Sequence, residues 1–240
     1  MPVKRSQSAL RVLTVLEGIA RHQPVGVSEL ARLIDDDKSA VQRAIMTLAD
    51  GGWIRMALGA SSKWQLTAHL LAVAHMGNTG NDLRQRVRST LEGLRDATEE
   101  TVLLTVPDVR RFVVIDAAES RHVLRTVHSI GVDVPVNGSA TARAILPYMP
   151  FEQQCEFLGE APNARVLAEF AETRKRGYAV SIGGVIEGST NIAAPILESE
   201  GHPIGAMVVS GPSERLPVKR HAKIGQTVLE ALRSLSRSTH

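Results

Sequence analysis

Several polar side chains between residues 38 and 47 have the types and the spacing needed to bind nucleic acid. The apolar residues of this stretch follow the i, i+3, i+4, i+7 pattern of an amphipathic helix from Lys38 to Ala49: Val41, Ala44, Ile45 and Leu48. Glutamine pairs with the edge of adenine, and arginine pairs with guanine or phosphate. The free N–H groups at a helix start favour a phosphate. The polar face therefore predicts a DNA-contacting surface, and an ordinary solvated helix face is the alternative. The candidate DNA-contacting residues are Lys38, Ser39, Gln42, Arg43 and Thr47.

The elements in front of this helix form a helix-turn-helix pattern. A first helix is predicted from Ser6 to His22 and ends before Pro24. A short second helix is predicted from Glu29 to Ile34, with Ser28 as its N-cap. A turn then leads into the helix that carries the candidate DNA contacts.

A predicted hairpin follows the third helix. Its strands are Trp53–Leu58 and Lys63–Thr67, and residues 59–62 have the composition of a hairpin loop. A helix-turn-helix followed directly by a hairpin is the plan of a winged helix, with an unrelated small helical subdomain as the alternative. Arg55 and Lys63 on the hairpin are expected to reach the minor groove or the DNA backbone, with plain surface charges as the alternative.

The charge distribution also favours a nucleic-acid partner for this region. The chain carries 28 basic and 25 acidic side chains, and the first 80 residues hold nine basic and six acidic ones, so the surplus lies there. Ordinary scatter of surface charges is the alternative explanation. Three acidic residues form the run Asp35–Asp37 before the third helix. Asp37 is expected to cap that helix. Asp35 and Asp36 have no evident structural role and are expected to weaken non-specific DNA binding.

The remaining sequence changes from purely helical to mixed patterns. Helices are predicted at Leu66–Met76, Leu83–Thr98, Ser139–Tyr148, Phe151–Leu158, Ala164–Arg176 and Val218–Ser234. Strands are predicted at Thr101–Val106, Arg111–Ala117, His122–Val127, Tyr178–Ile182, Asn191–Leu197 and Pro203–Ser210. The fold class is therefore α+β in two domains. We place a DNA-binding domain at 1–76, a linker helix at 77–98 and a sheet domain at 99–240.

Several function classes find no support in the sequence. It contains no G-x-S-x-G, H-E-x-x-H, P-loop or G-x-G-x-x-G motif, so we expect no enzyme and no cofactor. The single cysteine, Cys155, makes neither an internal disulfide nor a thiolate metal site. No apolar run is long enough to span a membrane, and no secretory signal is recognisable. The expected compartment is the cytoplasm.

Six segments of the chain resemble the isocitrate lyase regulator (IclR) family. The N-terminal ones are Ser8–Leu13, Val27–Ala31 and the third helix. The C-terminal ones are Arg176–Ser181, Ile192–Ile196 and Val209–Pro212, in the family's order and spacing. The resemblance covers nearly the whole chain. It implies a transcription factor with a winged helix and a GAF-like effector domain, in which a curved antiparallel sheet flanked by helices holds a small organic ligand. It also implies homodimers or dimers of dimers on operator DNA.

The resemblance places the effector site at Gly138, Ala140, Thr141, Ser181, Asn191, Val208 and Ser210. The family often has an acidic residue where Ser181 stands, a cysteine where Asn191 stands and a serine where Val208 stands. Its usual Gly-Lys pair is Ala142-Arg143 here. The site is thus neutral, with amide and hydroxyl donors and one more apolar wall. We expect the effector to be a small carboxylic acid or amide. The alternative is that these polar residues only form hydrogen bonds within the sheet and bind no ligand.

These observations favour an effector-responsive, DNA-binding transcriptional regulator. Two other classes of function stay open at this point. One is a small-molecule-binding module that regulates a protein partner, and the other is an enzyme built on the α+β domain. Failure to bind DNA at low salt would favour the first, and turnover of a bound ligand would favour the second.

Overall fold

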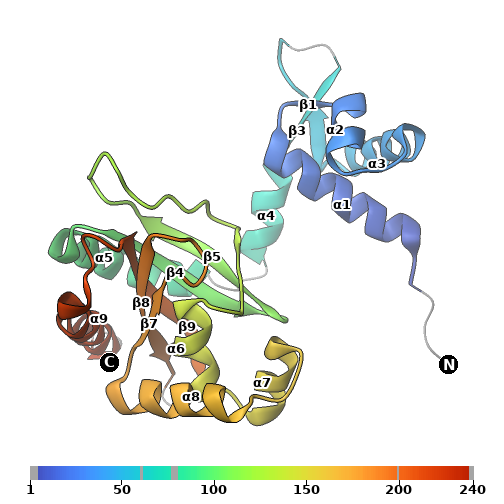
Figure 1. The fold of residues 1–240 in the computed structure, drawn as a ribbon. Helices are drawn as coiled ribbons and strands as arrows, with labels where there is room; N and C mark the ends of the chain where they lie inside the picture. Colours follow the sequence, from blue (N-terminus) through green and yellow to red (C-terminus); the bar gives the residue numbers. More distant parts are fainter. Residues whose placement is uncertain (1–4, 60–61, 77–80, 199, 238–240) are drawn as a thin grey trace. The chain divides into compact units, whose positions relative to one another are not determined.

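The computed structural model describes residues 5–59, 62–76, 81–198 and 200–237 (Figure 1). Contacts within the chain divide it into two compact units, Met1–Thr79 and Gly80–His240. Each unit has a hydrophobic core of its own. Residues 60–61 of the predicted hairpin loop and the predicted break at 77–80 lie outside the described residues.

The first unit is a winged helix-turn-helix. Its elements are α1 (Gln7–His22), β1 (Val25–Gly26), α2 (Val27–Leu33), α3 (Lys38–Asp50), β2 (Ile54–Met56), β3 (Lys63–Leu66) and α4 (His69–Met76). The apolar stripes of α1, α2 and α3 meet in one core around Ile19, Leu30 and Ile45, all fully buried. β1 joins the hairpin to give a small sheet of order β1-β3-β2. The packing leaves the polar side of α3 outside.

The second unit is a six-stranded antiparallel sheet with helices on both faces. Its strands are β4 (Thr101–Asp108), β5 (Arg111–Ala118), β6 (Asp133–Val134), β7 (Ala179–Ile182), β8 (Ser189–Leu197) and β9 (Pro203–Pro212). Its helices are α5 (Asn81–Thr98), α6 (Ala140–Ile145), the 3₁₀ turn η1 (Leu146–Tyr148), α7 (Phe151–Leu158), α8 (Ala164–Arg176) and α9 (Val218–Arg237). The strand order is β6-β5-β4-β9-β8-β7. The predicted α+β class is confirmed.

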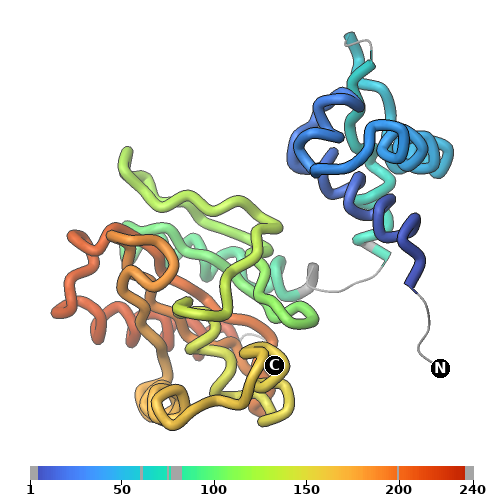
Figure 2. Tube along the Cα trace, turned by 45° about the vertical axis from the view of Figure 1, so that its right-hand side comes forward, coloured from blue at the N-terminus to red at the C-terminus, as the bar shows by residue number. Residues whose placement is uncertain are grey.

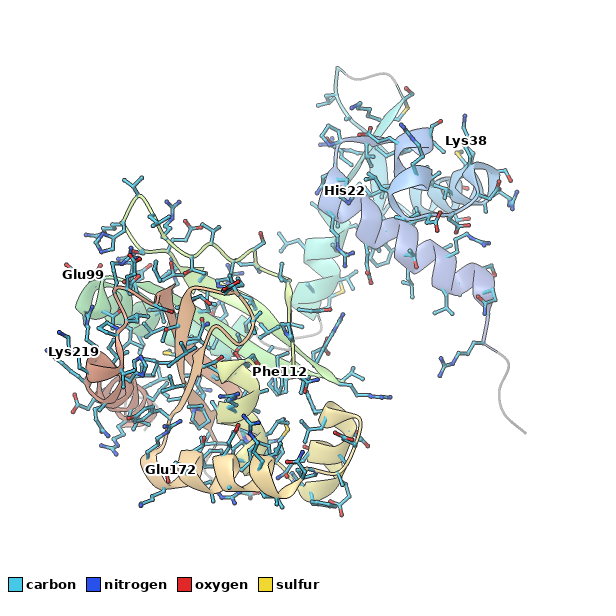
Figure 3. The ribbon with its side chains drawn as sticks, in the orientation of Figure 1. His22, Lys38, Glu99, Phe112, Glu172 and Lys219 are labelled. Atoms are coloured by element: carbon cyan, nitrogen blue, oxygen red, sulfur yellow. The ribbon has the colours of Figure 1, made fainter. Side chains whose placement is uncertain are left out.

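Alternate side chains of each strand enter two different cores, because a strand has a period of two. Val102 and Leu104 of β4 pack with α5 and α9, whereas Leu103 packs on the α6 side. Phe112 of β5, labelled in Figure 3, is also on the α6 side. Its ring stacks on Phe157 of α7, with the ring centroids 4.8 Å apart. The sheet thus lies between α5 and α9 on one face and α6, backed by α8, on the other (Figures 1 and 2).

The structure corrects two predicted features. The N-cap of α2 is Gly26, not Ser28, because the helix already begins at Val27, directly after β1. The strand predicted at His122–Val127 does not form. Asp133–Val134 pairs with the free edge of β5 instead, after a turn at Gly131 whose N–H donates to the Val114 carbonyl at 2.7 Å.

Side chains, not a strand ladder, hold the segment that contains His122–Val127. The Thr101 hydroxyl donates to the Thr126 carbonyl at 2.9 Å, and Arg215 donates to the Leu124 carbonyl at 3.0 Å. Arg215 is itself fixed by a two-point pair with buried Glu100, at 2.6 and 2.7 Å. The segment therefore runs across the end of the sheet on the α6 side rather than extending it.

Candidate nucleic-acid face and ligand cavity

The outward face of α3 carries all five predicted DNA-contacting side chains of that helix. Val41 and Ile45 are fully buried on the inner side, which turns the polar residues out. The five are exposed, and Lys38 stands at the start of the helix on the outside of the unit (Figure 3): Lys38, Ser39, Gln42, Arg43 and Thr47. A helix with one such polar, partly cationic face has the shape and the donors to enter a major groove.

The predicted cap of α3 is present and includes one of these residues. The Asp37 carboxylate accepts the Ala40 N–H at 2.9 Å and the Ser39 hydroxyl at 2.5 Å. The Ser39 hydroxyl bond, followed by the backbone bond, holds the pKa of Asp37 below its ordinary value. Arg43 in turn donates to the Ser39 hydroxyl oxygen at 3.3 Å. Ser39 thus connects the helix cap to the arginine of the outward face.

Asp36 has a structural role that the sequence did not reveal. Arg11 of α1 donates to its carboxylate at 2.6 Å and, with the Asp37 N–H, lowers its pKa. The pair ties α1 to the turn before α3, so the prediction that Asp36 lacks a structural role is wrong. Asp35 adopts a positive φ of 51° in the same turn, where a short polar side chain is tolerated.

The two wing residues lie on the hairpin strands as predicted, and both are exposed. Arg55 of β2 is opposite Gln65 of β3 in the strand register. The Lys63 ammonium lies 3.9 Å from the Glu29 carboxylate of α2. An exposed ion pair of this length is weak, so Lys63 remains available to a phosphate.

In the second unit, four polar residues form a row across the α6 side of the sheet. Thr101 of β4 pairs with Ser210 of β9, Ser210 with Asn191 of β8, and Asn191 with Ser181 of β7. Residues directly opposite each other on neighbouring strands point to the same face. Three of the predicted effector residues are therefore brought into one line, although they come from three strands.

A small cavity of about 40 Å³ lies next to this row. Its lining includes four of the seven predicted effector residues: Ala140, Thr141, Asn191 and Val208. The Asn191 amide contributes a polar group, while Val208 and Leu103 from the neighbouring strands form an apolar wall. The cavity therefore combines one amide and several hydroxyl groups with an apolar wall, which is the usual composition of a small-molecule site.

The other three predicted residues do not line the cavity but hold its surroundings. The Ser181 hydroxyl donates to the Gly138 carbonyl. Gly138 has a φ of +81°, and a Cβ there would collide with the Gly184 carbonyl. The third, Ser210, lies 3.4 Å from the imidazole Nε2 of His128. Gly138 and Ser181 thus lie close against Gly184 of residues 183–188, which we call the covering loop.

Eight residues that line the cavity are not among the seven predicted effector residues: Leu103, Thr105, His128, Val134, Ser139, Val185, Ile186 and Ser189. Leu103 and Thr105 share a face by their spacing of two, but the sequence does not show which strands they adjoin. Val185 and Ile186 come from the covering loop, where they are 41% and 48% exposed. An apolar pair in a glycine-rich loop was the available signal for a cavity wall.

Among these eight residues, His128 is the one whose side chain can gain or lose a proton near neutral pH. It comes from the irregular segment before β6 and is half-buried against the end of the sheet. Burial lowers the pKa of its imidazole below the ordinary value of 6.5. The ring is therefore neutral at pH 7 and above, with Ser210 as a hydrogen-bond partner.

The sequence matches family models in both units. The model described as the bacterial transcriptional regulator IclR C-terminal domain matches residues 77–237, and the IclR helix-turn-helix domain matches residues 8–56. The chain belongs to the IclR family. The transcriptional repressor IclR of Escherichia coli K12 is 27% identical to it over 244 residues, covering 96% of this chain and 89% of that protein.

Other IclR proteins agree with this assignment. The regulator BhcR of Paracoccus denitrificans is 27% identical, over 94% of this chain and 85% of that protein. A regulator from Alicyclobacillus acidocaldarius has the same fold, with a TM-score of 0.78 at 20% identity, covering 98% and 99% of the two chains. An IclR homologue from Microbacterium hydrocarbonoxydans, solved with 4-hydroxybenzoate, has a TM-score of 0.77 at 21% identity over 97% and 100%.

This IclR-family chain is a DNA-binding transcriptional regulator. Its curated relatives are named as repressors and regulators, which favours regulation over the enzyme alternative. No helix within the described ranges is long and apolar enough to cross a membrane. The same ranges contain no group of three His, Cys, Asp or Glu side chains placed to hold a metal ion.

Proposed function

We propose that this protein controls transcription from operator DNA as a homodimer or dimer of dimers, under the control of a small carboxylic acid or amide. Residues 1–76 bind the DNA, residues 77–98 link the two functions, and residues 99–240 bind the effector. The protein works in the cytoplasm, where it meets chromosomal DNA. The effector shifts the balance between arrangements of the dimer and so changes how two α3 helices meet their half-sites.

The exposed polar face of α3 is the observation that carries the DNA-binding part of this proposal. In it, Gln42 and Arg43 read base edges, and Lys38, Ser39 and Thr47 contact the backbone or neighbouring bases. Arg55 and Lys63 of the wing contact phosphates or the minor groove. The cap bonds between Asp37, Ser39 and Arg43 support this division, because they hold the start of the face in one geometry.

Apolar side chains on the surface of the first unit support a dimer. Leu10 and Leu13 of α1 are 46% and 56% exposed, and Leu71 and Met76 of α4 are 63% and 81% exposed. Large apolar groups exposed on a DNA-binding unit are candidates for a contact between protein chains. A second copy supplies the same apolar groups in a two-fold arrangement.

The composition of the cavity supports a small acid or amide as effector. Asn191, Thr141 and Ser189 offer polar atoms, and Leu103, Val134 and Val208 offer an apolar wall. The volume of about 40 Å³ holds only a few non-hydrogen atoms. Two- and three-carbon acids suit that volume, whereas an aromatic acid, such as the 4-hydroxybenzoate bound by the Microbacterium homologue, requires the covering loop to move.

Fluorescence anisotropy of the purified full-length protein tests both halves of the proposal. DNA from upstream of its own gene is titrated against random DNA as competitor, with and without a panel of aliphatic and aromatic acids and amides. We expect binding that survives the competitor and changes with a member of the panel. Binding no tighter than to random DNA contradicts operator recognition at this site, and no response to the panel contradicts the effector class.

Asn191→Leu sharpens the effector test. Loss of the amide should weaken binding of the active acid or amide about tenfold, since a lost hydrogen bond to a charged or polar group costs about 1.5 kcal/mol. Asn137→Leu is the control, because Asn137 is exposed and does not line the cavity. Equal affinities in wild type and Asn191→Leu, measured by calorimetry, would remove Asn191 from the site.

A further inference from the structure

His128 is the one ionisable side chain among the residues that line the cavity in the described part of the chain. It comes from the irregular segment that crosses the end of the sheet, and the Thr101 and Arg215 bonds fix that segment. Its Nε2 atom lies 3.4 Å from the Ser210 hydroxyl, at the border between the polar row and the cavity. The imidazole is therefore held beside the space that a ligand fills.

The charged groups on the elements around the cavity are paired or exposed outside it. β8 and β9 carry no charged residue at all. The charged residues of β4, β5, β6, α6 and the segment itself form ion pairs away from the cavity lining: Asp108 and Asp133 with Arg111, Asp116 with Arg84 and Arg88, Arg143 with Glu169, Arg121 with Asp96, Arg125 with Glu119, and Glu100 with Arg215. His122 of the segment is exposed. Glu187 of the covering loop is exposed. Charge inside the cavity therefore depends on His128.

A carboxylate that enters such a cavity loses its hydration shell and needs a counter-charge or several strong donors. Thr141 and Thr105 face each other at 3.5 Å, and the Ser189 hydroxyl donates to the Ile186 carbonyl at 2.7 Å. The Thr141 hydroxyl and the Asn191 amide, which already donates to the Ser189 hydroxyl at 3.5 Å, then supply few donors for a full negative charge. An imidazolium supplies both a charge and an N–H donor.

We propose that the effector is an organic acid bound as its anion, and that His128 takes up a proton from solvent to become its counter-ion. This rests on the proposed effector function and narrows it from an acid or amide to an acid. His128 then determines specificity: an anion gains a charged partner in the cavity, and the neutral amide of the same shape does not.

The pH dependence of binding follows from the direction of the His128 shift. Burial lowers the pKa of His128 in the free protein, and a bound anion raises it. Between these two values, binding requires one proton, so affinity for the acid falls about tenfold for each unit of rising pH. Below the lower value and above the higher one, affinity is independent of pH. Affinity for the amide is not raised by protonation of His128.

Propionate and propionamide are matched probes, because they have nearly the same shape and differ in charge. The full-length protein, labelled with ¹³C in its histidine rings, is titrated with pH in the presence of each compound and without either. The signal that His128→Gln removes belongs to His128. We expect propionate to raise the pKa of His128 by about one unit or more, and propionamide to leave it unchanged.

Affinity measurements separate this role from a merely structural one. His128→Gln should weaken propionate binding tenfold or more at pH 6 and leave propionamide binding unchanged. His122→Gln is the control, since His122 belongs to the same segment, is exposed and does not line the cavity. If propionate binds and the pKa of His128 does not change, the proposed role of His128 is wrong, while the proposed effector function stands. If wild type binds neither compound, nor any other acid or amide, the proposed effector class fails and the inference with it.

Discussion

The outward face of α3 and the cavity of the second unit are both polar, but their polar groups are in opposite situations. On α3 the polar side chains are exposed, and their bonds are local, as in the Thr47 hydroxyl bond to the Arg43 carbonyl at 3.1 Å. Around the cavity, Thr101 and Ser181 are buried and bound to backbone carbonyls of the segments that cover the sheet. The polar groups of α3 are thus available to a partner molecule. Most of those around the cavity are instead bound to other parts of the second unit.

This difference separates mutations by what they change. Replacing a polar residue on α3 should change DNA binding and leave the fold intact, because its side chain does not support other elements. Replacing a residue that holds the cavity should lower stability first and binding as a consequence.

Gly138→Ala should have the largest effect. The added Cβ would collide with the Gly184 carbonyl, and the φ of +81° is itself unfavourable for alanine. We expect a loss of about 3 kcal/mol in the free energy of unfolding of the second unit, measured by urea denaturation. Gly159→Ala is the control: its φ is +77°, but no described atom lies within 4 Å of the new Cβ, so about 1 kcal/mol is expected. Equal losses would mean that the covering loop does not rest on Gly138.

The same difference explains what the sequence could and could not predict. The α3 face follows from one short amphipathic repeat, so Val41 and Ile45 alone determine which residues point outward. Asp37 was predictable as a cap because capping is local. The role of Asp36 was not, since its partner Arg11 lies 25 residues away.

The cavity depends on strand register and on irregular segments, which no local pattern specifies. The family resemblance placed Asn191 in the site, and pairing with β9 is what brings it opposite Ser210. His128 was missed because its segment has β-rich composition, yet side chains hold it as an irregular stretch. The family resemblance supplied four lining residues, and the structure added eight, which come from strands β4, β6 and β8, the N-cap of α6 and the irregular segments.

Arg43→Ala should have the next largest effect, on DNA binding alone. Loss of a base contact costs about 1–3 kcal/mol and relaxes specificity at one position, whereas loss of a phosphate contact weakens all sequences alike and reduces the salt dependence. Thermal unfolding should stay unchanged, because Arg43 is exposed. Arg165→Ala, on an 87% exposed arginine of α8, is the control for general charge. Wild-type affinity and salt dependence in Arg43→Ala would show that α3 does not present this face to DNA.

Asp35→Gly should have the smallest effect and the opposite sign. Asp35 occupies a positive φ of 51° in the turn before α3, a conformation that glycine adopts freely, so stability should change by less than about 0.5 kcal/mol. Removing a negative charge near the phosphates should tighten DNA binding about twofold in 50 mM salt and less in 200 mM salt. Asp35→Asn separates charge from backbone strain, because asparagine also tolerates this conformation but carries no charge. If Asp35→Asn binds DNA like wild type while Asp35→Gly binds more tightly, the turn acts through its backbone, and the local charge near α3 has no part in binding.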